Sequence, residues 1–341
     1  MKASIIFITY QHEQYVRPAI RAALEQDYTN LELVICDDAS KDRTVEIIEE
    51  EIQQNRSGIH IVRLYHEVNQ GLIGNFNAGL KACSGDIVVL MSGDDISFAH
   101  RVSCLVKAFE ENPECLLVSS NWNTIDEFGG VVAEGFCDQA ECLYTHAEAP
   151  RLLYTKSPIL GATAAYSRTL YDKFGPLEKF AYVEDTCFWF RAAILGSLYF
   201  IQEPLVNYRV HTASYTYRPL GKSREVEVEK HLKHIHHYQF MMKQHRQDLD
   251  TITHLGIVDP VTAKHMRRNV TRELESHRIN RYSLHDYPWS LWLASAWNYF
   301  RSAPSFKFFF KIYKSKFKLR LLNSKKERYF KRILAGPNGS G

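Results

Sequence analysis

The sequence predicts an α/β fold in which a mostly parallel sheet is flanked by helices and followed by a helical C-terminal region. Short apolar runs alternate with segments of helical periodicity through the first hundred residues, a pattern typical of βαβ units. Two of the predicted strands end in adjacent carboxylates. The 341 residues are 45% hydrophobic, which suffices for a full core and for more than one module.

Each predicted strand is a run of apolar side chains bounded by polar ones. The strands lie at residues 5–8, 31–36, 59–65, 87–91, 116–119, 159–166 and 198–206. Each predicted helix repeats apolar side chains on one face. The helices lie at residues 16–24, 45–52, 76–81, 184–195, 225–246 and 260–277, and an aromatic helical stretch follows at 287–300.

Two pairs of carboxylates follow strands of the predicted parallel sheet. They are Asp37-Asp38 and Asp94-Asp95. Because the carboxyl ends of parallel strands lie together, both pairs are expected to face one crevice, where open α/β sheets bind ligands. Adjacent acids repel each other, and a cation shared with a diphosphate relieves that repulsion; Mg²⁺ prefers such carboxylate and phosphate oxygens. The alternative is a polar turn that opens the next helix.

Several motifs occur in a fixed order along the chain. They are residues 4–10 (SIIFITY), 36–44 (CDDASKDRT), 69–79, 92–95 (SGDD), 183–191 (VEDTCFWFR) and 208–211 (YRVH). Together they resemble the inverting family 2 glycosyltransferases with the GT-A fold, over about residues 3–216. The sequence departs from the family pattern at Gln11, where Asn is usual, and at Ser92, which replaces the first acid of an Asp-x-Asp motif.

The resemblance implies a role for each candidate site residue. Asp185 is the expected general base, on the side of the sugar opposite the leaving diphosphate. The expected donor-nucleotide contacts are Thr9, Tyr10, Glu13, Asp38, Asn75 and Asp94. The expected ligands of Mn²⁺ or Mg²⁺ are Asp94, Asp95 and His211, and the expected acceptor or phosphate contacts are Glu184, Arg209 and Gly161.

These residue types also have structural explanations. Glu184 and Asp185 would suit the first turn of a helix, where the dipole favours acids. His211 would serve as a loop histidine, and Arg209 as part of a surface ion pair. Gly161 would lie in a tightly packed strand.

The resemblance also implies how the chain is organised. Residues 1–218 are the expected GT-A catalytic domain, with a nucleotide-binding half at 1–95 and an acceptor-side half at 96–218. Residues 219–335 are the expected helical C-terminal region with a basic aromatic tail, and residues 336–341 a disordered tail.

Residues 301–334 are strongly basic, whereas the rest of the chain is acidic. This tail carries a net charge of +11, which leaves −8 for the remainder of a chain whose total is +3. Basic side chains interleaved with aromatics are typical of segments that lie in the headgroup plane of an anionic membrane. A packing helix and a nucleic-acid patch are the alternatives, and the acidic body would repel a nucleic acid.

The expected function is transfer of a sugar from a UDP- or dTDP-sugar to a glycan or lipid-linked acceptor in bacterial surface-polysaccharide synthesis. Seven scattered cysteines without a Cys-x-x-Cys pair and no apolar run of about 20 residues favour a cytoplasmic enzyme, peripheral at the inner membrane face. A homo-oligomer stays open. A nucleotidyltransferase is an alternative, although residues 11–15 (QHEQY) lack its Gly- and Lys/Arg-rich loop. An inactive nucleotide-sugar binder is a third hypothesis, opposed by Asp185 and left open by Ser92.

Overall fold

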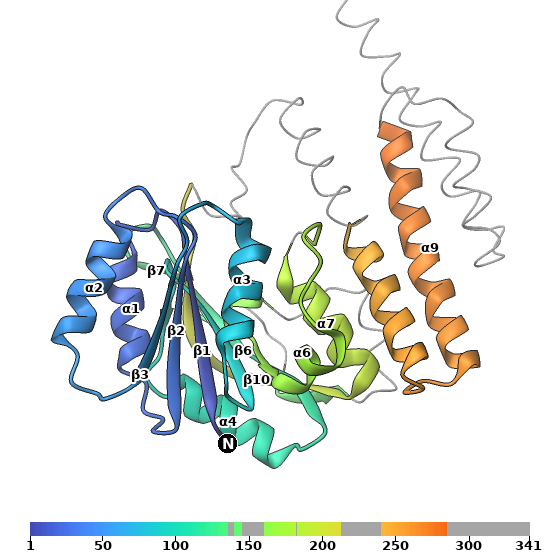
Figure 1. Cartoon of the computed structure of the whole chain (residues 1–341), viewed down its shortest axis with the longest axis horizontal. Helices are drawn as coiled ribbons and strands as arrows, with labels where there is room; N and C mark the ends of the chain where they lie inside the picture. The colour runs from blue at the N-terminus through green and yellow to red at the C-terminus, as the bar shows by residue number, and fades with distance from the viewer. Residues whose placement is uncertain (136–139, 145–159, 182, 213–239, 285–341) are drawn as a thin grey trace, which may run out of the picture. The chain divides into compact units, whose positions relative to one another are not determined.

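The computed structural model describes residues 1–135, 140–144, 160–181, 183–212 and 240–284 (Figure 1). The chain comprises two compact units, one of residues 1–221 and 247–258 and the other of residues 222–246 and 259–341. In the second unit, helix α9 spans Pro260–Leu284 and Arg246 donates to the Thr271 hydroxyl at 3.1 Å. The predictions for residues 287–300, 301–334 and 336–341, and for most of 225–246, lie outside the described residues.

The described strands of the first unit form one mixed sheet. Its parallel part has the order β3 (His60–Tyr65), β2 (Leu31–Asp37), β1 (Ala3–Thr9) and β4 (Ile87–Ser92). The order continues with β9 (Ala165–Ser167), β6 (Cys115–Ile125), β10 (Ser197–Arg209) and β5 (Ile96–Ser97). Strand β9 runs antiparallel to β4 and β6, whereas β7 (Val131–Ala133) and β8 (Cys142–Tyr144) pair with β6 and β10.

Helices cover both faces of the sheet (Figure 1). Ile5 and Phe7 of β1 pack with α1 (Val16–Leu24), α2 (Thr44–Gln54) and α4 (Arg101–Glu111). Ile6 packs on the opposite face with α3 (Gly71–Ala82), α6 (Arg168–Phe174) and α7 (Glu184–Leu195). Because successive side chains of a strand alternate between two buried faces, the parallel strands are apolar almost throughout.

The predicted α/β class is confirmed. Helices α4 and α6 and the short strands β5, β7 and β8 were not predicted, and two predicted segments differ in the structure. The helix expected at residues 76–81 begins earlier, at Gly71. The strand expected at 159–166 is wrong for its central part, because Gly161–Thr163 form a 3-10 turn, η1, and β9 starts at Ala165. Thr163 N–H donates to the Leu160 carbonyl at 2.9 Å and Ala164 N–H to the Gly161 carbonyl at 3.0 Å, which closes the turn.

The described part of the chain contains no helix that is both long and apolar enough to cross a membrane.

Candidate active site

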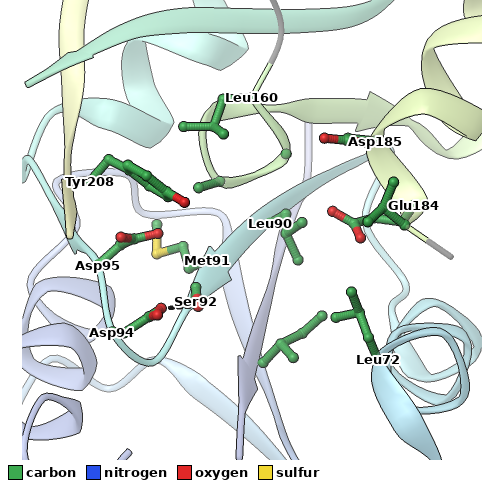
Figure 2. Close-up of a pocket in the computed structure, with 14 residues that line it drawn as sticks. Leu72, Leu90, Met91, Ser92, Asp94, Asp95, Leu160, Glu184, Asp185 and Tyr208 are labelled. Atoms are coloured by element: carbon green, nitrogen blue, oxygen red, sulfur yellow. Dashed lines mark hydrogen bonds between the residues drawn. The ribbon is translucent and has the colours of Figure 1, made fainter. Parts of the chain in front are cut away.

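A cavity of about 180 Å³ lies at the carboxyl edge of the parallel strands (Figure 2). Side chains of Leu90 and Met91, from the end of β4, line its middle. Carboxylates line two opposite sides, Asp94 and Asp95 on one and Glu184 and Asp185 on the other (Figure 2). The structure therefore brings together acids that lie about ninety residues apart in the sequence.

Asp94 is held by groups from three separate segments. Its Oδ2 lies 3.2 Å from His211 Nε2 and 3.9 Å from His12 Nε2, and its Oδ1 accepts the Ser92 hydroxyl. Burial raises the pKa of Asp94, but the His211 hydrogen bond, the His12 charge and Ser92 together leave that pKa below its ordinary value. The carboxylate therefore stays ionised in a buried setting.

Asp95 is compensated by Arg209 and Arg101, but its burial and the charge of Asp94 outweigh them. Asp95 Oδ1 accepts the Arg209 backbone N–H at 2.8 Å, and its side chain is buried. Burial and the neighbouring Asp94 raise the pKa of Asp95 well above its ordinary value. A divalent cation would relieve this repulsion, and the two carboxylates with the His211 imidazole are a donor set that suits Mg²⁺ or Mn²⁺.

Arg209 positions the acid loop from the end of β10. Its Nε donates to the Asp94 carbonyl at 2.8 Å, and its Nη1 donates to the Asp126 and Glu127 carbonyls at 3.0 and 3.2 Å. The guanidinium lies 5.1 Å from the centroid of the Tyr15 ring. Arg209 thus ties two loops together at the cavity rim.

His12 is a site residue that the sequence analysis did not single out. Its Nδ1 lies 3.3 Å from the Thr9 hydroxyl, while its Nε2 faces Asp94. Burial lowers the pKa of His12, and the opposing charge of Asp94 raises it again in part. Its place in the loop that follows β1, two residues after Tyr10, is the signal that could have identified it.

Glu184 and Asp185 open helix α7 against the turn η1. Asp185 Oδ1 accepts the backbone N–H and hydroxyl of Thr186. Burial raises the pKa of Asp185, although hydrogen bonds from Thr186 and the Gly161 backbone lower it in part. Burial, followed by the charge of Asp185, raises the pKa of Glu184 to about 8.

Gly161 lets η1 approach the two acids. A Cβ at this position would lie 2.5 Å from Glu184 Oε1 and 3.2 Å from Asp185 Cβ. Real side chains do not approach so closely, so the acids occupy the space that any other residue would fill. The structure places Gly161 against the acid pair, and its predicted role as an acceptor or phosphate contact stays a prediction.

Two of the residues predicted to contact the nucleotide line a second hollow. Tyr10 and Glu13 line a second hollow of about 450 Å³ together with His12, Tyr15 and His211. Glu13 Oε2 also accepts the Arg43 backbone N–H at 3.1 Å, and Thr9 is fully buried beneath the rim.

Asp38 and Asn75 bond to backbone groups near the same edge. Asp38 Oδ1 accepts the Gln70 N–H at 2.6 Å, and Asn75 Nδ2 donates to the Cys36 carbonyl at 3.0 Å. Neither is among the described residues that line the two cavities. Their roles toward a nucleotide stay predictions.

Arg101 is a second residue that the sequence analysis did not single out. It is buried at the start of α4, and its Nη1 and Nη2 donate to the Ser97 hydroxyl at 2.8 Å and the Leu90 carbonyl at 2.9 Å. Its charge acts on Asp95. An arginine on the same helical face as Leu105 and Phe109 is the signal in the sequence.

Comparisons with known proteins identify the family of the chain and its fold. The glycosyl transferase family 2 model matches residues 4–175. An uncharacterized glycosyltransferase of Nostoc sp. is 28% identical over 237 residues, which cover 67% of this chain and 71% of that protein. TarS of S. aureus in complex with UDP-GlcNAc has a TM-score of 0.61 at 19% identity, covering 89% of this chain and 82% of that one. The mannosyltransferase PcManGT from Pyrobaculum calidifontis, in complex with GDP-Man and Mn²⁺, has a TM-score of 0.50 at 16% identity, covering 94% and 86%.

The structural likenesses show the fold, and they confirm the prediction of a GT-A architecture. The family model spans half of the sequence, including β1, β2, β4 and both acids that follow β4. The chain therefore belongs to glycosyl transferase family 2, and it is a glycosyltransferase.

Proposed function

We propose that this glycosyltransferase moves a sugar from a nucleoside diphosphate to a hydroxyl group of a glycan or lipid-linked glycan, with inversion at the anomeric carbon. The observation that carries the proposal is the pair of acid clusters on opposite sides of one cavity. In-line displacement needs a cation and phosphate site on one side of the sugar and a base on the other. Figure 2 shows carboxylates available for both.

The leaving-group side is formed by Asp94, Asp95 and His211, which would hold Mn²⁺ or Mg²⁺. When bound, such an ion supplies Lewis-acid stabilisation of the negative charge that develops on a departing phosphate. Arg209 holds the backbone of Asp94 through its carbonyl, and the His12 imidazole faces the Asp94 carboxylate. TarS in complex with UDP-GlcNAc, and the mannosyltransferase with GDP-Man and Mn²⁺, support a nucleotide-sugar donor and a divalent ion.

The acceptor side is formed by Asp185, with Glu184 and Gly161 beside it. Asp185 takes the proton of the acceptor hydroxyl. The hydroxyl oxygen bonds to the anomeric carbon while the bond between that carbon and the diphosphate breaks. Burial raises the pKa of Asp185, which makes its carboxylate a stronger base than an exposed aspartate. Attack from the face opposite the diphosphate inverts the anomeric configuration.

The nucleotide is proposed to bind along the second hollow. Tyr10 and Glu13, which line this hollow, would contact the base and ribose, with the buried Thr9 supporting them from behind. Asp38, at the same edge of the sheet, would accept the imide N–H of uracil or thymine. Asn75 would support this pocket from α3, where it holds the end of β2 in place. This assignment favours a UDP- or dTDP-sugar as donor.

A hydrolysis screen tests the proposal without knowledge of the acceptor. UDP-, dTDP- and GDP-sugars are incubated with the protein, and release of the nucleoside diphosphate is measured with Mn²⁺, with Mg²⁺ and with EDTA. We expect slow release from a UDP- or dTDP-sugar that depends on the ion, and loss of that release in Asp94→Asn. Release of pyrophosphate from a nucleoside triphosphate and a sugar phosphate would instead support a nucleotidyltransferase.

The basic tail is proposed to bring the enzyme to an anionic membrane at the cytoplasmic face, where a lipid-linked acceptor for O-antigen, capsule or other surface polysaccharide would be held. The supporting observation is the net charge of +11 at residues 301–334, which lie outside the described residues. Liposome flotation compares the full chain with a chain that ends at residue 300, on anionic and neutral vesicles. Binding to anionic vesicles should require the tail; equal flotation of both chains would contradict this role.

A further inference from the structure

Two ring contacts meet at Tyr15, which lines the second hollow together with His211. The centroid of the Tyr15 ring lies 4.5 Å from that of the His211 imidazole, with an angle of 39° between the ring planes. The Arg209 guanidinium lies 5.1 Å from the same Tyr15 centroid. Tyr15 belongs to the loop that follows β1, whereas Arg209 ends β10 and His211 follows it. One aromatic side chain therefore joins two segments that are far apart in the sequence.

The backbone that carries Tyr15 is fixed by hydrogen bonds and by the core. The N–H groups of Tyr15 and Val16 both donate to the His12 carbonyl at 2.8 Å, where helix α1 begins. The His12 N–H donates to the Thr44 hydroxyl at 2.8 Å, and Val16 is fully buried. The Tyr15 ring thus stands on a fixed support, so it can restrict the side chains that pack against it.

His211 is the side chain whose orientation depends on this contact. It is 5% exposed, and its Nε2 lies 3.2 Å from Asp94 Oδ2. An imidazole binds a metal ion through a lone pair in the plane of its ring, so a rotation of the ring turns the donor atom away from the ion. Groups outside the ligand set usually fix that rotation, and their loss weakens metal binding by about 10- to 100-fold. The Tyr15 ring packs against His211 in the manner of such a group.

The contact with Arg209 extends from the same ring to the acid loop. Arg209 Nε donates to the Asp94 carbonyl at 2.8 Å, and the Arg209 backbone N–H donates to Asp95 Oδ1 at 2.8 Å. A guanidinium beside the face of an aromatic ring is attracted by the negative charge of that face. Tyr15 therefore contacts two residues that reach the acid pair, His211 by ring packing and Arg209 by a cation–π interaction.

We propose that Tyr15 is a positioning residue of the metal site: its ring holds His211 and Arg209 in the orientations in which they meet the acid pair. This inference rests on the proposed role of Asp94, Asp95 and His211 as ligands of Mn²⁺ or Mg²⁺. The ring performs the role, and the phenol hydroxyl does not, because both contacts are with the ring. Phenylalanine should therefore replace Tyr15, and an aliphatic side chain should not.

Metal binding by the full-length protein tests the inference. Mn²⁺ is titrated into the protein by calorimetry with UDP present, and a titration into UDP alone is subtracted. Tyr15→Leu should weaken Mn²⁺ binding by about tenfold, as for loss of a group that orients a metal ligand. Tyr15→Phe should keep the wild-type Mn²⁺ affinity, because it keeps the ring. Unchanged affinity in Tyr15→Leu, or an equal loss in Tyr15→Phe, would overturn the inference.

Tyr171→Leu is the matched control, because the Arg168 guanidinium lies 5.0 Å from the centroid of the Tyr171 ring in α6. Both substitutions remove an arginine–tyrosine contact, so each should lower the unfolding temperature measured in EDTA. Mn²⁺ affinity should fall in Tyr15→Leu alone. If both variants keep their Mn²⁺ affinity, Tyr15 is structural. If both lose it equally, general destabilisation is the cause, and the inference is wrong in either case.

A double-mutant cycle tests the route through His211. In a His211→Gln background, Tyr15→Leu should weaken Mn²⁺ binding less than it does in the wild type, because one of the side chains that the ring orients is gone. Fully additive losses would overturn the proposed route.

Asp94→Asn separates this inference from the proposed metal site. Equal Mn²⁺ binding by the wild type and Asp94→Asn would refute the metal site, and the positioning role with it. Weak binding by Asp94→Asn together with wild-type binding by Tyr15→Leu would refute the positioning role alone.

Discussion

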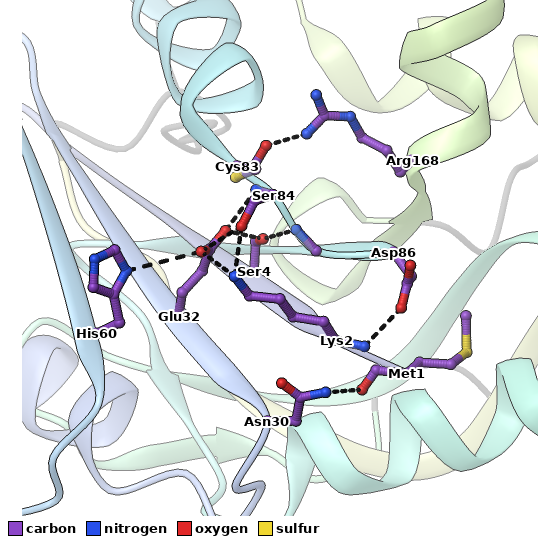
Figure 3. A network of polar contacts seen from close by, with 11 residues as sticks. Met1, Lys2, Ser4, Asn30, Glu32, His60, Cys83, Ser84, Asp86 and Arg168 are labelled. Atoms are coloured by element: carbon purple, nitrogen blue, oxygen red, sulfur yellow. Dashed lines mark hydrogen bonds and ion pairs between the residues drawn. The ribbon is translucent and has the colours of Figure 1, made fainter.

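Two buried glutamates at opposite ends of the same sheet have opposite electrostatic surroundings. Glu32, at the amino end of β2, accepts hydrogen bonds from Lys2 Nζ at 2.7 Å, the Ser4 hydroxyl at 2.5 Å and the Ser84 N–H at 2.6 Å (Figure 3). Burial alone would raise its pKa, but these donors lower the pKa of Glu32 to about 2. The carboxylate is ionised and fully engaged with the protein.

Glu184, at the carboxyl end, is also buried but has a second acid beside it. Burial and Asp185 raise the pKa of Glu184 to about 8. The comparison teaches how the fold uses buried acids. At Glu32, hydrogen-bond donors surround the carboxylate, so it holds neighbouring segments together. At Glu184, a second acid lies beside the first, so the pair can act on a ligand or in a reaction.

The largest expected effect is on the acceptor side of the cavity. Asp185→Asn removes the proposed base, so transfer should fall by about 10²- to 10⁴-fold. Donor affinity measured by calorimetry should be retained, because the base is not a donor ligand. Asp86→Asn is the control at the amino end, where Asp86 Oδ2 accepts the Lys2 N–H at 2.7 Å. It should leave transfer unchanged, and full activity in Asp185→Asn would contradict the assignment.

The second prediction concerns stability at the amino end. Glu32→Ala leaves the donors of Lys2, Ser4 and Ser84 without their acceptor, so the free energy of unfolding should fall by about 2–4 kcal/mol. Urea unfolding measures this loss. Glu111→Ala, which breaks an exposed ion pair to Lys107 with an N–O distance of 3.8 Å, should change it by less than about 0.5 kcal/mol. Reduced activity per folded molecule in Glu32→Ala would contradict the view that the amino end of the sheet serves stability and the carboxyl end serves the reaction.

A matched pair of glycines gives the third prediction. In Gly161→Ala the new Cβ meets the mobile tip of Glu184, so the acid shifts and transfer should fall about ten- to hundredfold with little loss of stability. In Gly85→Ala it would lie 2.8 Å from the Ser4 backbone nitrogen, which cannot move away easily. That variant should lose about 1–3 kcal/mol of unfolding free energy while the folded fraction keeps its activity. Thermal unfolding and transfer assays on both variants test this prediction. A loss of stability in Gly161→Ala and a loss of activity in Gly85→Ala would contradict it.

The fourth prediction uses pH. The folded protein keeps the Glu184 proton up to a pKa of about 8, whereas the ordinary value is 4.5, so this group makes the fold less stable as pH rises across that range. Glu32 has the opposite sign: its contribution is present above the ordinary value of 4.5 and is lost as pH falls toward about 2. Glu184→Gln should therefore be more stable than the wild type at pH 8, by about 1 kcal/mol, and not at pH 4. If the difference in unfolding free energy between Glu184→Gln and the wild type were the same at pH 4 and pH 8, the prediction would be wrong.

Much of the fold could be predicted because β1, β2 and β4 are buried on both faces. Apolar runs identified β1, β2 and β4, and helix α7 begins and ends where periodicity placed it. The failure at residues 159–166 has a physical cause. A short apolar run is compatible with either a strand or a 3-10 turn. Here the bonds from Thr163 N–H to the Leu160 carbonyl and from Ala164 N–H to the Gly161 carbonyl close a turn, in which Gly161 lies against Glu184.

The candidate site could be predicted where chain order alone matters. Asp94 and Asp95 follow a parallel strand, so sheet topology places them at the carboxyl edge. Asp185 was assigned to the site by the resemblance of residues 183–191 to the family motif.

The groups behind these acids could not be predicted in this way. Arg101 is buried behind them, and it donates to the Ser97 hydroxyl and the Leu90 carbonyl, which a sequence pattern does not pair with it. A sequence motif indicates which residues face a ligand. It does not indicate which buried residues lie behind them.

The smallest expected effect concerns backbone strain at the carboxyl end. Among the described non-glycine residues, Gln11 and Ala39 have positive φ, 54° and 64°, and they follow β1 and β2. Strained backbone is typical of functional edges, and asparagine tolerates this left-handed region better than glutamine does. Gln11→Asn should therefore raise the unfolding free energy by about 0.5 kcal/mol.

The Gln11 N–H donates to the Ser40 hydroxyl at 2.8 Å, and this bond survives the substitution because it uses the backbone alone. Thermal unfolding measures the gain. Gln14→Asn, in the same loop but without positive φ, is the control and should gain nothing. An equal gain in both variants would mean that the side-chain change, and not the positive φ of Gln11, causes the gain in stability. The carboxyl and amino edges of the sheet would then differ in their charges but not in their backbone strain.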